Sequence, residues 1–229
     1  MITLFHDTLS VPARTARLVC DEYGVQYDPV IEQLWRRRDE FAMVNPAMSL
    51  PVLVDGGTTV CGLRPVIEYL DETVGTMRRE GRLHPDSAPA RAEVRRLVDW
   101  FATKMNDEVT RHIVRERIEK PVMPAELGGG SPNSQSLRVA RSNVKHHLRY
   151  LEWLAGSRAW LAGDGISYAD MAGAAAVSVL DYMGEIDWAE VPYTKDWYGR
   201  MKSRPAFRAV LADRVKGHAP AKHYADLDF

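Results

Sequence analysis

Residues Asn45–Leu70 read NPAMSLPVLVDGGTTVCGLRPVIEYL. The β-branched run Leu50–Val54 predicts a strand. Asp55–Gly57 predicts a turn and Thr58–Cys61 a second strand, so the two strands form a hairpin. Apolar residues then recur at the spacing of one helix face, at Leu63, Val66, Ile67, Leu70 and Val74. The pattern therefore predicts the order strand, hairpin strand, helix.

Prolines in this stretch fix the backbone at two points. Pro65 suits the first turn of the predicted helix, where a missing N–H costs nothing. Pro51 opens a strand, and its X-Pro bond is a candidate for the cis form. With Asn45 and Pro46 upstream, the arrangement resembles the second half of a thioredoxin-like domain of the glutathione-transferase type. That resemblance implies a cis Leu50–Pro51 bond and a backbone beside it that binds the peptide-like part of glutathione.

The sequence departs from the family pattern at the start of the predicted helix. Glutathione transferases usually place an acidic residue there for the ligand's amino group, followed by Ser or Thr for its carboxylate. Here the two positions are Gly62 and Leu63, whose side chains can do neither. Each lost charged partner is worth roughly 1.5–3 kcal/mol. We therefore expect glutathione binding to be weakened by orders of magnitude, although the Leu63 backbone N–H still offers a weak anion site.

Length and composition indicate a soluble globular protein. The chain has 229 residues, 45% hydrophobic and 27% charged, with a formal net charge of −1. This near-zero charge gives no reason to expect nucleic-acid or membrane binding. No apolar run approaches the roughly 20 residues of a membrane span, and the N-terminus does not resemble a signal peptide. The two cysteines form no CxxC motif, which favours a reduced, cytoplasmic setting.

The whole chain fits an α/β thioredoxin-like domain followed by an all-α domain. Residues 1–75 predict the order β-α-β-α-β-β-α, with strands at Ile2–Phe5 and Val25–Ile31. A polar segment with glycine and proline at 76–89 predicts a linker. Residues 90–212 predict an all-helical domain, and 213–229 a C-terminal tail. Ser167 and Asp170 form a capping box ahead of a small-residue helix, a pattern that resembles the family's C-terminal domain signature.

Ser10 has two possible roles. As the N-cap of the first helix it has a folding role only. It also occupies the place where many transferases keep the hydroxyl that stabilises the glutathione thiolate, and we favour the first role because the ligand anchors are missing. Cys20 lies within the first helix and is expected in the core. The histidines lack the spacing of metal ligands, so no metal site is predicted.

Trp35, Arg36, Arg37 and Arg38 form a second candidate site, a protein-binding patch. Trp and Arg are enriched in interface hot spots. The alternative, equally weighted, is an inward-facing Trp35 beside solvated arginines. The tail adds apolar and acidic residues close to the chain end: Tyr224, Asp226, Leu227, Asp228 and Phe229. A terminus is disordered by default, but three large apolar groups favour docking on the chain itself or on a partner.

The fold, the missing anchors, the Trp-Arg stretch and the tail together resemble one subfamily, the transferase-like cell-division proteins of alphaproteobacteria. That resemblance implies a cytoplasmic homodimer at the division site that binds FtsZ filaments through Trp35, its arginines and the tail. It implies no glutathione chemistry. The near-zero charge and the lack of a long apolar run predict no nucleic-acid partner and no membrane insertion. The alternative is a glutathione transferase or isomerase that uses Ser10 to activate glutathione. In that case Leu50, Pro51, Gly62 and Leu63 would line a working ligand site and not a vestigial one.

Overall fold

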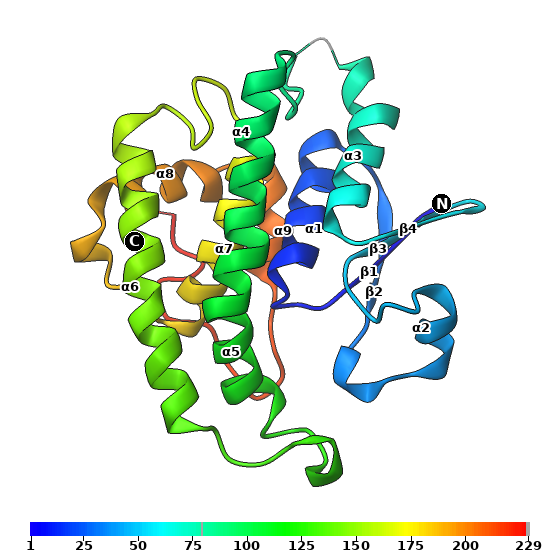
Figure 1. Ribbon diagram of the computed structural model, residues 1–229, viewed down its shortest axis with the longest axis vertical. Helices are drawn as coiled ribbons and strands as arrows, with labels where there is room; N and C mark the ends of the chain where they lie inside the picture. Colours follow the sequence, from blue (N-terminus) through cyan, green and yellow to red (C-terminus); the bar gives the residue numbers. More distant parts are fainter. Residues whose placement is uncertain (79, 228–229) are drawn as a thin grey trace.

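The computed structural model describes residues 1–78 and 80–227. The N-terminal part is a small mixed sheet with helices on both faces (Figure 1). Its elements are β1 (Ile2–His6), α1 (Val11–Tyr23), β2 (Tyr27–Ile31), the 3-10 turn η1 (Leu34–Arg36), α2 (Asp39–Val44), β3 (Val52–Asp55), β4 (Thr58–Cys61), α3 (Leu63–Thr73) and the 3-10 turn η2 (Gly75–Met77).

The sheet has the strand order β2-β1-β3-β4. β1 runs parallel to β2 and antiparallel to β3, and β3 and β4 form the hairpin predicted from the sequence. The Leu50–Pro51 bond is cis, which confirms the expectation from the family resemblance. The predicted thioredoxin-like arrangement of the N-terminal part is therefore correct.

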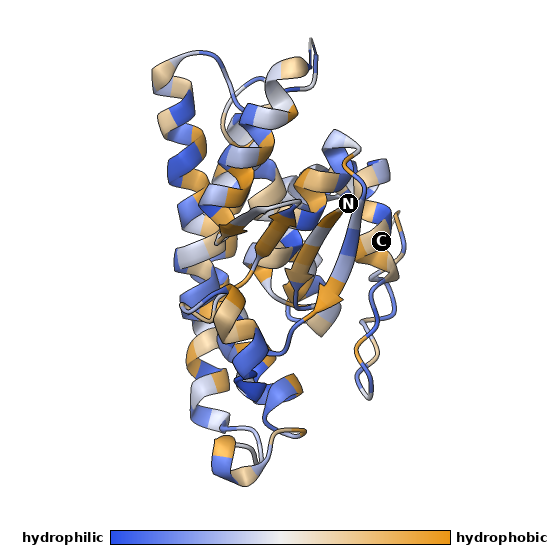
Figure 2. Cartoon of the chain, turned by 90° about the vertical axis from the view of Figure 1, so that its right-hand side faces the viewer, coloured by the Kyte–Doolittle hydropathy of each residue, from blue (hydrophilic) through white to orange (hydrophobic). Residues whose placement is uncertain are grey.

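Successive side chains of a strand point to opposite faces of the sheet, so each face contributes hydrophobic side chains to a core. Leu4 and Leu53 are fully buried in the large core that includes α1 and α3. Val52 on the other face packs in a smaller cluster with Phe41 of α2, whose ring centroid lies 5.6 Å from that of Phe5. Figure 2 shows hydrophobic colouring on strands of the sheet and on the helices around it.

The second part is all helical, as predicted. A continuous helical run from 88 to 119 and the long helix α6 lie side by side (Figure 1). The elements are α4 (Ala88–Asp99), the π-helical η3 (Trp100–Thr110), α5 (Arg111–Val114), the π-helical η4 (Arg115–Glu119), the 3-10 turn η5 (Ala125–Leu127), α6 (Ser134–Ser157), α7 (Tyr168–Met183), the 3-10 turn η6 (Trp188–Glu190), α8 (Pro192–Lys202), the 3-10 turn η7 (Pro205–Phe207) and α9 (Arg208–Ala212).

Helix α7 is the centre of this part, and all of its residues are buried. The predicted capping box is confirmed: Ser167 caps α7 and the Asp170 carboxylate accepts from the Ser167 N–H at 2.9 Å. Asp170 also accepts from the Leu161 N–H and from the indole N–H of Trp197. A motif recognisable as a helix start thus also holds two neighbouring segments in place.

Two predicted boundaries differ from the structure. The second strand was expected from Val25 but begins at Tyr27, because the Val25 N–H still bonds the Cys20 carbonyl at 2.8 Å, behind the left-handed Gly24 that ends α1. The helix predicted between the second strand and the hairpin is split into η1 and α2. The interruption is Arg37, whose φ is +47°. The predicted domain limits at 75, 90 and 212 stay predictions.

Candidate functional site

A cleft of about 250 Å³ opens where the N-terminal part meets the helical part. Four separate segments supply its lining: Asp7, Thr8 and Leu9; Ile31, Gln33 and Trp35; Val114, Ile118, Glu119 and Val122; and Arg214, Val215 and Lys216. More than half of the lining residues are apolar. Asp7, Glu119, Arg214 and Lys216 are the charged residues in this lining. Such a cleft at a domain junction is the usual setting of a binding site.

Trp35 is the predicted site residue that lines this cleft. Its side chain is partly buried, whereas Arg36, Arg37 and Arg38 are exposed. The Arg36 guanidinium lies 5.1 Å from the centroid of the Trp35 ring, a cation–π arrangement. Arg38 Nε lies 3.5 Å from the carboxylate of the buried Glu32. Trp35 therefore lines a cleft while the arginines lie in solvent, and the protein-binding role of this patch stays a prediction.

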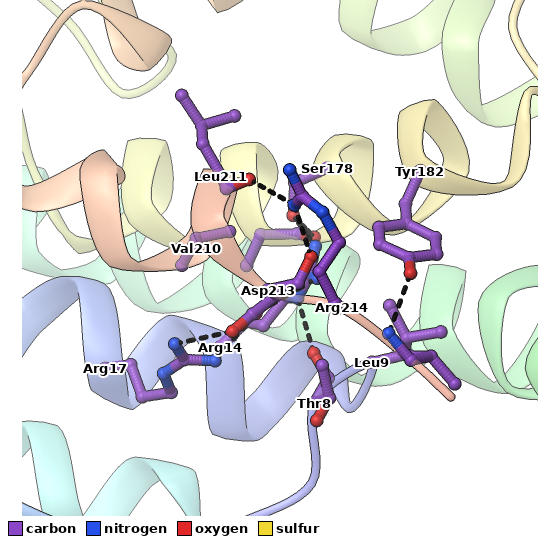
Figure 3. Close-up of polar contacts among 12 residues, drawn as sticks. Thr8, Leu9, Arg14, Arg17, Ser178, Tyr182, Val210, Leu211, Asp213 and Arg214 are labelled. Atoms are coloured by element: carbon purple, nitrogen blue, oxygen red, sulfur yellow. Dashed lines mark hydrogen bonds and ion pairs between the residues drawn. The ribbon is translucent and has the colours of Figure 1, made fainter. Parts of the chain in front are cut away.

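One wall of the cleft is formed by the segment that follows α9. An ionic contact between α1 and this segment holds the wall in place. Figure 3 shows Arg14 and Arg17 of α1 converging on Asp213. The next turn of chain is fixed by Tyr182, whose hydroxyl accepts from the Val215 N–H at 2.9 Å and donates to the His218 carbonyl at 2.7 Å. These contacts place Arg214, Val215 and Lys216 beside the N-terminal part.

Two carboxyl groups in the cleft are unusual. Burial raises the pKa of Asp7 above its ordinary value, and the charges of Arg14 and Asp213 act on it in opposite directions. Burial also raises the pKa of Glu119, and the charge of Asp7 raises it further. Neither was predicted from the sequence, because they come from distant segments with no shared spacing.

The positions of the expected glutathione site are brought together on the sheet side. The Gly62 N–H donates to the Pro51 carbonyl at 2.9 Å, and Leu50, Pro51 and Leu63 are buried. Gly62 is the N-cap of α3, makes no side-chain cap, and has φ +89° and ψ 155°. A residue other than glycine carries backbone strain in that region. The anchoring side chains of a transferase are thus absent from both positions.

The structure places Ser10 at the N-cap of α1, where its hydroxyl accepts from the Ala13 N–H at 3.4 Å. Burial raises the pKa of Cys20 to about 12, so this thiol is not a nucleophile near neutral pH. Burial also lowers the pKa of His6 to about 4, aided by the Arg17 charge. Cys20 and His6 are therefore both neutral at physiological pH.

The tail lies partly inside the chain's own core. Tyr224 is fully buried; its hydroxyl donates to the Val210 carbonyl at 2.9 Å and accepts from Arg14. This differs from the expectation that Tyr224 belongs to a partner surface, because a buried ring offers nothing to a partner. Asp226 and Leu227 are exposed. Asp228 and Phe229, also expected on that surface, lie outside the described residues.

Within residues 1–78 and 80–227, no group of three or more histidine, cysteine or acidic side chains is arranged to hold a metal ion. In the same part of the chain, no helix combines the length and the apolar character needed to cross a membrane.

Family models for the N-terminal and C-terminal domains of glutathione S-transferase match residues 4–78 and 131–214. The chain belongs to the glutathione S-transferase family. It is 39% identical to FtsZ-localized protein A of Caulobacter vibrioides, over 99% of this chain and 98% of that protein. A solved structure from Sinorhizobium meliloti, described as a glutathione S-transferase, is 54% identical, with a TM-score of 0.98 over 100% of both chains. FzlA from C. crescentus is 38% identical, with a TM-score of 0.90 over 100% of this chain and 99% of that chain.

Proposed function

We propose that this protein is a non-catalytic member of the transferase family that binds FtsZ filaments in the cytoplasm and regulates their organisation or constriction. The observation that carries the proposal is the similarity over nearly the whole chain to a protein named for its localisation with FtsZ. The chemistry of Gly62 and Leu63 supports it, because the family's glutathione anchors are missing at the start of α3.

The partner surface in this proposal is built around Trp35. A partly buried tryptophan at the mouth of a cleft, stacked with Arg36, has the composition of an interface hot spot. Arg37, Arg38 and the exposed Asp226 and Leu227 complete the proposed set.

Co-sedimentation with polymerised FtsZ tests the proposal. The protein should pellet with filaments formed in GTP and stay in the supernatant when FtsZ is kept unpolymerised. Equal recovery in both pellets would reject filament binding.

We also propose that the protein is a symmetric homodimer, the closed arrangement commonest among oligomers. Light scattering should then give about twice the chain mass of 25.8 kDa. A particle of one chain mass at micromolar concentration would contradict the dimer.

A second function is kept because parts of the transferase site remain. The cis Leu50–Pro51 bond and the Ser10 hydroxyl at the start of α1 are retained. They favour a glutathione transferase or isomerase with an unusual ligand site. Retention on glutathione-agarose, with release by free glutathione, would support this alternative and count against the vestigial reading of the site.

A further inference from the structure

The chain that follows α9 runs from the wall of the Trp35 cleft into the hydrophobic core. Residues 214–216 line the cleft, and Tyr224 near the other end is fully buried in the large core. We call residues 214–224 the strap. One short segment thus forms part of the cleft wall and also reaches the core, so we expect a displacement of its buried end to move the wall as well.

Tyr182 of α7 holds the strap at several points. Its hydroxyl accepts from the Val215 N–H at 2.9 Å and donates to the His218 carbonyl at 2.7 Å. Its backbone carbonyl accepts from the Ala221 N–H at 3.0 Å, and its ring centroid lies 5.1 Å from that of Tyr224. Because one residue makes all of these contacts, we expect them to form and break together.

Arg14 of α1 connects the root of the strap with its buried end. Its guanidinium donates to the Tyr224 hydroxyl and to the Asp213 carboxylate, each at 3.2 Å, and the whole residue is buried. Between these anchors the strap has exposed positions: Lys216, Gly217, Ala219 and Lys222. Segments with few buried apolar contacts open locally at low free energy. We therefore expect the strap to leave and rejoin the helical part while the rest of the chain stays folded.

His218 is the point where this attachment depends on a proton. Its Nε2 lies 3.4 Å from Nη2 of Arg117, on η4. A guanidinium can only donate, so in this contact Nε2 accepts and the neutral ring carries its proton on Nδ1. Protonation would place a second N–H and a positive charge against Arg117. Burial lowers the pKa of His218 below its ordinary value, and the Arg117 charge lowers it further.

The acid beside Arg117 is already engaged with two guanidinium groups. Glu185 accepts from Arg117 at 2.7 Å and from Arg141 of α6 at 2.9 Å through both oxygens. The hydroxyl of Tyr182, on α7, is occupied by the His218 carbonyl. Two cations thus share one carboxylate on this side of the strap. An added proton on His218 therefore enters surroundings that already carry a net positive charge.

His223, the second histidine of the strap, is placed differently. Its Nε2 lies 2.8 Å from Oδ1 of Asp181 and 3.2 Å from the indole nitrogen of Trp188. Lys202 Nζ lies 3.8 Å from the other oxygen of Asp181. A proton on this ring is met by a carboxylate, which favours the docked strap. The contact that acid weakens is therefore the one made by His218.

We propose that the strap is a pH-sensitive device that closes one wall of the Trp35 cleft, docked while His218 is neutral and loosened when this ring takes up a proton. A group whose pKa is depressed in the docked state supports docking above its ordinary pKa, here 6.5. That support is lost as the pH falls from this value to the lower pKa of the docked ring. The proposal does not depend on the identity of the partner.

Hydrogen exchange of the full chain, followed by NMR from about pH 8 to about pH 5.5 and corrected for intrinsic rates, tests the device. Each unit of pKa difference is tenfold in the docking equilibrium, so protection of the Val215 and Ala221 amides should fall by about three- to tenfold in acid. The amide of Val177, inside α7, is the internal reference. His218→Gln keeps an acceptor for Arg117 and should retain protection, whereas the exposed His146→Gln should behave as the wild type.

The cleft is followed in the same samples through 5-fluorotryptophan, with the Trp35 resonance assigned from Trp35→Phe. This resonance should shift over the pH range in which the strap amides lose protection, and should stay unchanged in His218→Gln. Tyr182→Phe should lower the protection of Ala221 even at pH 8, because it removes the hydroxyl and leaves the carbonyl that Ala221 uses.

Three results would overturn the inference. The first is full protection of Val215 and Ala221 in acid, or an equal loss in His218→Gln. The second is loss of protection without any change at Trp35, which would separate the strap from the cleft. The third is unchanged protection of Ala221 in Tyr182→Phe, which would show that the strap does not move as one unit.

Discussion

The guanidinium of Arg17 donates two hydrogen bonds to Asp213, at 2.8 Å and 2.9 Å, one to each carboxylate oxygen. Arg17 lies on α1 of the N-terminal part, and Asp213 follows the last helix of the chain. This bidentate pair, with Arg14 as a second donor to Asp213 at 3.2 Å, connects the two parts next to the cleft. The geometry of the cleft therefore depends on a contact between residues almost 200 positions apart.

Removing Asp213 should destabilise the whole chain. The side chains of Arg14 and Arg17 are 0% and 7% exposed, so Asp213→Ala leaves two buried cations without their carboxylate. Breaking a buried pair from one side costs about 3–5 kcal/mol, which corresponds to a fall in Tm of roughly 10 °C for a chain of this size. Calorimetry measures it, with the exposed Asp164→Ala as control. Similar Tm values for the two variants would refute the role given to Asp213.

Trp35→Ala should nearly abolish co-sedimentation with FtsZ filaments. Truncating a central aromatic hot spot costs about 2–4 kcal/mol, a loss of affinity of roughly thirty-fold or more. The control is Trp153→Ala, which removes an indole that is 58% exposed on α6. Circular dichroism and dimer mass must match the wild type, because Trp35 is partly buried. Normal filament binding by folded Trp35→Ala would move the partner surface elsewhere.

Asp226→Lys should weaken filament binding in a salt-dependent way, since an exposed rim charge acts mainly on association rate. A substitution is a better test than truncation after Val215, because truncation also removes the fully buried Tyr224. Asp164→Lys makes the same change of charge at another exposed position. Binding curves for Asp226→Lys that coincide with those of this control at low salt would exclude the tail from the surface.

The sequence predicted those features that depend on local pattern. The hairpin, the capping box at Ser167 and the helical second part follow from residue spacing, and the cis bond before Pro51 follows from the family resemblance. The cleft could not be predicted from residue spacing or from the family resemblance. Asp7 follows β1 and Glu119 ends a long helical run, and nothing in either segment indicates that both line one cleft.

Burial of the tail was equally hidden from the sequence. Residues 216–223 are mostly polar, with glycine, alanine and one proline, which is typical of a disordered end. Tyr224 is nevertheless buried, because Arg14 offers its guanidinium and Val210 its carbonyl to the phenol. Both partners are placed by tertiary packing that no local pattern encodes.

Glutathione should show no saturable heat in calorimetry at millimolar concentration. The two anchors replaced by Gly62 and Leu63 are each worth roughly 1.5–3 kcal/mol. An active glutathione transferase run in the same buffer is the positive control. A submillimolar dissociation constant would favour the enzymatic alternative over filament binding.

Glu119→Gln should raise stability at neutral pH and have no effect in acid. The folded-state pKa of Glu119 lies above its ordinary value of 4.5 because of burial and the Asp7 charge, with Arg115 opposing. Folding therefore favours the protonated acid, so ionised Glu119 lowers the free energy of unfolding as pH rises through the folded pKa. A gain of about 1 kcal/mol would raise Tm by about 2–4 °C, and we expect the lower end because solvent screens a partly exposed group.

Calorimetry at pH 7 and at pH 4 checks this sign. The gain should be present at pH 7 and should shrink toward zero as the wild-type acid becomes protonated, and Asp7→Asn should behave in the same way because its pKa is also raised. Glu126→Gln should change Tm at neither pH. A loss of stability at pH 7 in Glu119→Gln would mean that the carboxylate already has a stabilising partner in the folded chain.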